Sequence, residues 1–177
     1  MINIGRSCRD QAHFEWVMGK IQKHLCRSML DIGTWDGWLP ELCNRHTQHE
    51  LMTYGIESDS GLCAQARDKG IRMLNYTLTD RLPLNAEERI DLIAANEVLE
   101  HIDFKNVPGI IKDMDRAGRV CLVSLPDQRH EDNREHLWTP TEEVIGKLFG
   151  QFNLEVIRVE YAADTGIPPN WLISWTK

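Results

Sequence analysis

The hydrophobic positions along the chain change from a helical spacing to a series of short apolar runs. Over residues 9–26, apolar side chains recur at the spacing of an amphipathic helix. Beyond it, short apolar runs alternate with amphipathic segments to about residue 150. The runs predict strands at 29–32, 51–57, 71–76, 89–96 and 118–125. The segments between them predict helices at 38–45, 60–70, 97–117 (interrupted near Pro108) and 140–149.

This order of elements predicts an α/β fold. Strands that alternate with helices are typical of βαβ units and of a largely parallel sheet. The last two predicted strands, 152–162 and 170–177, are separated by too few residues for a parallel return, so we expect an antiparallel pair. We interpret the chain as a single domain, in which an N-terminal helix in residues 1–27 precedes the α/β unit of residues 28–177.

Two helix ends are marked by specific residues. Gly70 is expected to end the helix at 60–70, because glycine adopts the left-handed conformation common after a helix. The sequence TPTE (139–142) has the form of a capping box, in which Thr139 would cap the last helix and Glu142 would reach back. We therefore expect that helix to begin at Pro140.

A glycine-containing turn follows the first predicted strand. The segment MLDIGTWDGW (29–38) ends a buried run at Asp31 and then places Gly33 and Gly37 around Trp35. In an open α/β sheet, ligands bind beyond the carboxyl ends of the strands, and this turn lies there. The spacing is not that of a dinucleotide-binding fingerprint, and the turn contains no basic residue, so a pyrophosphate site is not expected. An ordinary tight turn is the alternative.

An acidic residue ends the second strand. Glu57 follows the glycines by about twenty positions, where a carboxylate commonly accepts hydrogen bonds from the two hydroxyls of a ribose. Together with the turn, it indicates a nucleoside-type ligand without a phosphate. A solvated acid at a strand end is the alternative. Since such a residue is outside the core, its loss should change folding little.

A third group of polar residues, NEVLEHI (96–102), follows the buried fourth strand. On a helix, Glu97, Glu100 and His101 would share one face beside the ligand edge of the sheet. Two carboxylates and an imidazole can perform acid–base chemistry or bind a metal. A solvated helix start, in which the helix dipole favours the acids, is the alternative.

These segments resemble the motifs of class I S-adenosylmethionine-dependent methyltransferases, in particular the ubiquinone-biosynthesis O-methyltransferases. LDIGTWDGW is similar to the first motif, YGIESD to the second and IDLIAANEVLEHI to the fourth-strand motif; EHLWTPTEEVIGKLF is similar to the segment before the last helix. The resemblance implies a Rossmann-like seven-stranded sheet of order 3-2-1-4-5-7-6 with helices on both faces. The sequence departs from the first motif at Trp35, where the family usually has glycine.

The resemblance also implies the cofactor S-adenosyl-L-methionine and residues that would hold it. Asp31 and the turn would bind the amino acid end, with Gly33 and Gly37 giving the backbone clearance, and Glu57 would bind the ribose. Asp80 would contact adenine, although it lies closer to the Leu-Pro of TLTDRLP than is usual. The implied cofactor-binding residues are Asp31, Gly33, Thr34, Trp35, Gly37, Glu57, Ser58, Asp80, Asn96 and Glu97.

Methyl transfer to a hydroxyl needs a base, and histidine has a suitable pKa. The candidate catalytic residues are Glu100, His101 and His136, the last in a charged loop after the fifth strand. We expect no metal ligands, with a divalent ion on Glu97, Glu100 and a histidine as the alternative. The acceptor is expected to be a small molecule. A cofactor-binding protein without catalysis, or a partner subunit, is the alternative function, and a homo-oligomer or a partner chain could complete the site.

Composition and charge limit the kinds of partner and the cellular compartment that we expect. The chain has 177 residues and a net charge of −7, which disfavours nucleic acid as the main partner. No apolar run is long enough to span a membrane, and the N-terminus lacks the apolar region of a secretory signal. The five cysteines are scattered, which favours free thiols in a reducing compartment. We therefore expect a cytoplasmic protein.

Overall fold

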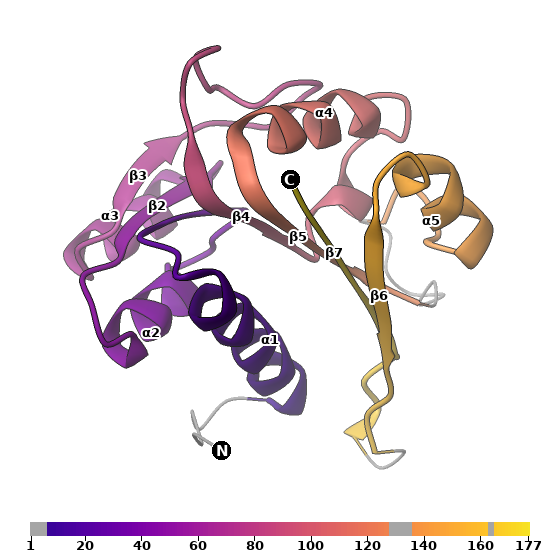
Figure 1. Ribbon diagram of the computed structural model, residues 1–177, viewed down its shortest axis with the longest axis horizontal. Coiled ribbons are helices and arrows are strands. Elements are labelled where there is room, and N and C mark those ends of the chain that lie inside the picture. Colours follow the sequence, from indigo (N-terminus) through magenta and orange to yellow (C-terminus); the bar gives the residue numbers. More distant parts are fainter. Residues whose placement is uncertain (1–6, 128–135, 163–164) are drawn as a thin grey trace.

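A seven-stranded sheet forms the centre of the computed structural model, which describes residues 7–127, 136–162 and 165–177 (Figure 1). The strand order is β3-β2-β1-β4-β5-β7-β6, and β7 runs antiparallel to both of its neighbours, β5 and β6. This confirms the predicted fold class and the antiparallel final pair. The strands are β1 (Ser28–Ile32), β2 (Met52–Glu57), β3 (Arg72–Asn75), β4 (Ile90–Asn96), β5 (Gly118–Pro126), β6 (Leu154–Val159) and β7 (Asn170–Thr176).

Helices cover both faces of the sheet (Figure 1). One face is covered by α1 (Cys8–His24), α2 (Trp38–His46) and α3 (Ser60–Asp68), and the other by α4 (Val107–Ala117) and α5 (Glu142–Phe149). A single 3-10 turn, η1 (Leu99–His101), follows β4. No helix in the described part of the chain is both long and apolar enough to cross a membrane.

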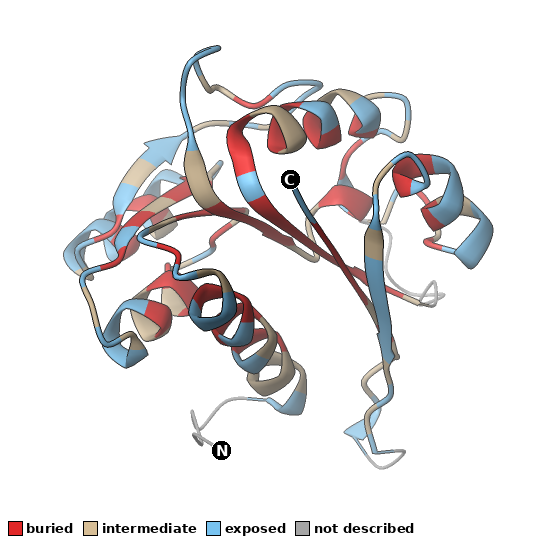
Figure 2. Cartoon of the chain, viewed as in Figure 1, coloured by how far each residue is buried: buried red, intermediate tan, exposed pale blue. Residues whose placement is uncertain are grey.

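The central strands are buried on both faces, as Figure 2 shows for the middle of the sheet. Side chains that alternate along each strand belong to two separate hydrophobic clusters. Met29, Leu92 and Leu122 pack with α1 and α2, whereas Leu30 and Ile93 pack on the side of α4 and α5. This explains why the sequence shows continuous apolar runs at β4 and β5.

The structure corrects two predicted helix boundaries. Pro108 does not interrupt a helix; it lies in the first turn of α4, where a missing N–H costs nothing. The last helix is capped by Thr141, whose hydroxyl accepts a hydrogen bond from the Val144 N–H, and not by Thr139. Thr141 directly precedes the helix, so the predicted N-cap at Thr139 lies two residues too early. Gly70 has a positive φ of 84° after α3, as expected.

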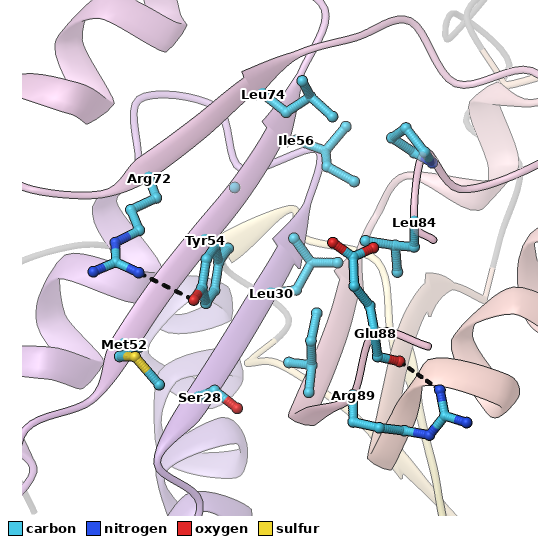
Figure 3. Close-up of a pocket in the computed structure, with 13 residues that line it drawn as sticks. Ser28, Leu30, Met52, Tyr54, Ile56, Arg72, Leu74, Leu84, Glu88 and Arg89 are labelled. Carbon is cyan, nitrogen blue, oxygen red and sulfur yellow. Dashed lines mark hydrogen bonds between the residues drawn. The ribbon is translucent and has the colours of Figure 1, made fainter. Parts of the chain in front are cut away.

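The connection between β3 and β4 leaves part of the sheet without a helix. Residues 76–89 contain neither helix nor strand. A cavity of about 280 Å³ lies here, against the amino ends of the strands (Figure 3). Its wall includes Leu30, Tyr54 and Leu74, and the Arg72 guanidinium donates to the Tyr54 hydroxyl at 3.2 Å. The cavity extends from the strand ends opposite to those where the sequence predicts a ligand site.

Candidate functional site

The turn after β1 forms without the glycine that the methyltransferase motif usually has in its middle. Gly33 and Gly37 have φ values of 67° and 78°, and Trp35 also takes a left-handed φ of 56°. The N–H groups of Gly33 and Thr34 both donate to the Ile56 carbonyl, at 2.8 and 3.2 Å. These bonds fix the turn against the end of β2. Trp35 therefore keeps the backbone conformation of a glycine, and its ring is 63% exposed.

The two glycines provide clearance within the protein itself, and the expectation that they also give clearance to a ligand stays a prediction. A Cβ at Gly33 would lie 2.3 Å from the Val98 side chain. A Cβ at Gly37 would lie 2.8 Å from Ala66, which is on α3, and 2.5 Å from Ile71, which follows that helix. Any larger residue would push apart the segments that surround the turn.

Asp31 is a buried carboxylate at the end of β1. Its side chain accepts a hydrogen bond from the Thr34 hydroxyl at 2.8 Å, and the residue is 3% exposed. Burial raises the pKa of Asp31 to about 7, because the charged form is poorly solvated there. The carboxylate lines a cavity, so a cationic group placed in that cavity would stabilise its charged form.

Glu57 is held in place by the turns on either side of it. One carboxylate oxygen, Oε2, accepts from the Trp35 N–H at 3.1 Å. The other, Oε1, accepts from the N–H and hydroxyl of Ser58 at 2.8 and 3.1 Å and from the Asp59 N–H at 3.0 Å. Glu57 thus joins the β1 turn to the start of α3. This corrects the expectation that it is an acid without a structural role.

Two adjoining cavities follow the carboxyl edge of the sheet. The larger, of about 410 Å³, includes Glu57 and Ser58 in its wall. The smaller, of about 280 Å³, includes Asp31, Thr34 and Asn96. Both are lined by Gly33, Trp35 and Glu97, so they meet at the turn. Eight of the ten predicted cofactor-binding residues therefore line this groove, and Gly37 and Asp80 line neither cavity.

Asp80 does not line the groove, and its predicted contact with adenine stays a prediction. It is exposed, and its carboxylate accepts from the Thr79 hydroxyl at 3.1 Å. A Cβ at Gly109 would lie 2.2 Å from the Asp80 carbonyl, so this segment packs closely on α4. The cavity wall is instead formed by Tyr76, Thr77 and Leu78.

The segment after β4 is not the helix that would align its acids. Glu97 has a left-handed φ of 52°, and only residues 99–101 form a 3-10 turn. The Glu97 carboxylate accepts from the Asn170 amide and forms an ion pair with Arg9 at 2.8 Å. Glu97 consequently points to α1 and β7, whereas Glu100 is fully buried. The expectation of one shared helical face is wrong.

The structure nevertheless brings the three candidate catalytic residues together. One ligand atom each from Glu100, His101 and His136 lies within 4.8 Å of the other two. The imidazole rings are 4.9 Å apart in an edge-to-face arrangement. Burial raises the pKa of Glu100 to about 8. Most of the charged loop before His136, residues 128–135, lies outside the described residues.

Sequence reasoning missed the contribution of α1 to the groove. Arg9, Asp10 and His13 line the smaller cavity. The His13 ring lies 3.4 Å from the Asn170 amide nitrogen, and burial lowers the pKa of His13. The helical periodicity of α1 marks its buried face, but nothing in that pattern shows that the end of this face closes a cavity.

Buried polar groups without described partners also gather at this edge. The amide oxygen of Asn96 and the Ser124 hydroxyl are buried and make no hydrogen bond to the described residues. Asn96 and Ser124 are neighbours across β4 and β5. The Oδ1 atom of Asn170, next to Glu97, is also buried without a hydrogen-bond partner among the described residues. Buried polar groups are usually satisfied, so these atoms indicate a place where a polar ligand or water binds.

The fold is shared with several solved structures of methyltransferases. The chain resembles magnesium protoporphyrin IX methyltransferase (ChlM) from Synechocystis PCC 6803, solved with bound SAM, at a TM-score of 0.72 and 14% identity, covering 96% of this chain and 80% of that one. It also resembles the N-methyltransferase NodS from Bradyrhizobium japonicum WM9, at a TM-score of 0.73 and 16% identity, covering 96% of each chain. At these identities the likeness shows the fold alone.

Sequence comparison is more specific. The chain is 28% identical over 120 residues to the bifunctional methionine biosynthesis protein MetXA/MetW of Rhodopirellula baltica (strain DSM 10527 / NCIMB 13988 / SH1). The match covers 63% of this chain and only 19% of that relative. The narrower resemblance to ubiquinone-biosynthesis O-methyltransferases stays a prediction. Residues 12–146 match the family described as methionine biosynthesis protein MetW, and the chain belongs to that family.

Proposed function

We propose that this protein binds S-adenosyl-L-methionine in the groove at the carboxyl edge and transfers its methyl group to the hydroxyl of a small molecule. One observation supports the proposal most strongly. The adjoining cavities have a buried carboxylate, Asp31, in one wall and a fixed carboxylate, Glu57, in the other, with the turn between them. A zwitterionic amino acid joined to a nucleoside presents complementary groups in that order.

The residues present fit such a cofactor. The ammonium group would lie by Asp31, a buried carboxylate whose side-chain hydrogen bonds come from the neutral Thr34 and Asn96 side chains. The ribose hydroxyls would donate to Glu57. Its Oε1 already accepts three hydrogen bonds, but Oε2 accepts one and keeps capacity for another. The Asn96 amide lies in the wall beside Asp31, and its oxygen makes no hydrogen bond to the described residues.

The chemistry of the proposed reaction is an in-line displacement. The bound cofactor supplies an electrophilic methyl group on a positively charged sulfur. The groove would align an acceptor with it, which contributes to the rate through proximity. His101 lines the larger cavity and contacts His136, so one of these imidazoles would accept the proton of the acceptor hydroxyl as its oxygen bonds to the methyl carbon.

A different function is favoured by the relative from Rhodopirellula baltica. There the matching segment is part of a longer chain whose name joins MetXA to MetW. A protein of this fold could bind the nucleoside and act on, or with, a partner in methionine biosynthesis without transferring a methyl group. The one amphipathic helix before the sheet does not form a large cover for an acceptor, so either a bulky acceptor or a partner chain would complete the site.

Isothermal titration calorimetry with S-adenosylhomocysteine tests the cofactor assignment. We expect one site of micromolar or tighter affinity, and no binding of NAD, because the turn lacks the phosphate-binding spacing. Asp31→Asn should weaken binding, whereas Asp80→Asn, a matched change outside the groove, should not. No heat at millimolar ligand would contradict the proposal.

Labelled methyl transfer separates catalysis from binding alone. A screen of catechols, hydroxy acids and sugars should reveal an acceptor. Replacing the true base, His101 or His136, by alanine should then lower turnover by about 10²–10⁴ while cofactor affinity stays unchanged. Cofactor binding without transfer to any acceptor would favour the non-catalytic alternative.

A further inference from the structure

Two chain segments that are far apart in the sequence place three metal-binding side chains side by side. Glu100 and His101 belong to η1, after β4, and His136 lies in the segment that follows β5. Their nearest ligand atoms are all within 4.8 Å of one another. Ligands about 2.1 Å from a common ion lie no more than about 4.2 Å apart, so small side-chain rotations would suffice to bind one.

Glu100 is the unusual member of this cluster. The residue is 0% exposed, and neither of its carboxylate oxygens accepts a hydrogen bond from any other described residue. The charged groups that act on it, Glu97 and Arg9, are bonded to each other and reach it only through space. A buried carboxylate without a partner is costly unless it is protonated or bound to a cation. The carboxylate thus lacks the one interaction that a metal ion would supply.

The backbone holds the two segments in register. The indole N–H of Trp138 donates to the carbonyls of both Leu99 and Ile102, each at 3.0 Å. The Leu137 N–H donates to the Glu100 carbonyl at 2.8 Å. Trp138 is buried and packs edge-to-face on Phe104. These contacts position the three side chains before any ion binds, which is what a metal site of high affinity needs.

We propose that Glu100, His101 and His136 form a binding site for a divalent transition metal ion such as Zn²⁺. Imidazole nitrogens with one carboxylate oxygen suit Zn²⁺, Fe²⁺ and Mn²⁺, and three protein ligands leave at least one position open. His101 also lines the larger cavity, so the proposed metal site adjoins the groove. This site revises the expectation that no metal ligands are present.

The consequence for catalysis rests on the proposed function. With the imidazole nitrogens bound to the ion, neither histidine would act as the base. The ion would instead bind the acceptor oxygen and lower the pKa of its hydroxyl, so that the proton would pass to solvent water in the open groove. The preferred acceptor would then be a hydroxyl compound with a second oxygen or nitrogen able to bind the same ion.

Metal titration of the protein alone tests the site. The untagged chain, in a Cys8→Ser background that removes the exposed thiol, is stripped with chelator and titrated with Zn²⁺ by calorimetry, and the bound metal is measured after desalting. We expect one equivalent per chain. Glu100→Gln, His101→Ala and His136→Ala should each lower the affinity at least tenfold. His46→Ala, which removes an exposed histidine of α2, should leave it unchanged.

Three results would overturn the proposal: no bound zinc in the parent protein, full affinity in all three variants, or an equal loss in His46→Ala. Should Glu100→Gln fail to fold by circular dichroism, the variants at His101, which is exposed, and His136, which is half-buried, decide the question. Neither cofactor nor acceptor is present in this titration. Its outcome is therefore separate from the outcome of the cofactor and methyl-transfer experiments.

Discussion

The buried carboxylate of Asp31 predicts that cofactor affinity rises with pH. In the protein without ligand, burial raises the pKa of Asp31 to about 7, so the side chain is largely protonated at pH 6. An ammonium group next to it would favour the charged form and lower its pKa. Binding at acidic pH must therefore release a proton from Asp31, and that release weakens the observed affinity.

The size of the effect follows from this pKa. If only the ionised form binds, the apparent dissociation constant increases by the factor 1 + 10^(pKa − pH). For a pKa of about 7, the affinity at pH 7.5 is therefore about 25-fold higher than at pH 5.5. His13 and the Arg9–Glu97 ion pair line the same cavity and contribute to its field. The profile therefore has to be compared with that of a variant lacking the Asp31 charge.

Asp31→Asn provides that comparison, since an asparagine oxygen can still accept from the Thr34 hydroxyl. Calorimetry with S-adenosylhomocysteine at intervals from pH 5.5 to 7.5 should show the rise in the parent protein and a flat profile in the variant. At pH 7.5 the variant should bind more weakly by about 1.5–3 kcal/mol, the usual contribution of a hydrogen bond to a charged group. Equal slopes in the two proteins would refute the assignment of the proton to Asp31.

Three further predictions concern stability and the second carboxylate. Glu57→Ala should weaken binding of S-adenosylhomocysteine by about 1.5–3 kcal/mol. It should also lower the free energy of unfolding in urea, because four hydrogen bonds to two turns are lost. An unchanged free energy of unfolding would contradict the conclusion that Glu57 joins the β1 turn to α3. Gly37→Ala should destabilise by about 1–3 kcal/mol, through a strained φ and a clash, and more than Gly70→Ala, which meets open space; equal losses would show that the clash is relieved. In metal-free protein, burial raises the pKa of Glu100 to about 8 in the folded state, above its unfolded value, so its contribution to stability is lost as the pH rises from about 4.5 to 8. Urea unfolding of Glu100→Gln across that range should lack this decline in the free energy of unfolding. An equal decline in the variant would refute the raised pKa of Glu100.

Much of the fold could be predicted because its signals are local. The apolar runs of β1, β2, β4 and β5 coincide with observed strands to within one or two residues, since a strand covered on both faces has to be hydrophobic throughout. The strand order came from resemblance and not from periodicity. The wrong boundary at Thr139 arose because Thr141, two residues later, offers the same hydroxyl cap, and the one at Pro108 arose because proline suits the first turn of a helix as well as a break.

The candidate site was predictable only in part. Residues at strand ends, such as Asp31 and Glu57, were found because the carboxyl edge of a parallel sheet gathers them. The contacts of Glu57 with Trp35 and Asp59 depend on the path of two turns, which no spacing rule describes. Glu97 was misplaced because its left-handed backbone ends the strand without starting a helix, a choice that tertiary contacts with Arg9 and Asn170 stabilise.

A crystal structure of the protein grown with S-adenosylhomocysteine tests the central claim most directly. The account predicts the ligand at the carboxyl edge, with its ammonium group within hydrogen-bond distance of the Asp31 carboxylate and its ribose hydroxyls against Glu57. The adenine would contact the wall formed by Tyr76, Thr77 and Leu78. A ligand bound elsewhere, for instance in the cavity beside Tyr54 at the opposite strand ends (Figure 3), would contradict it.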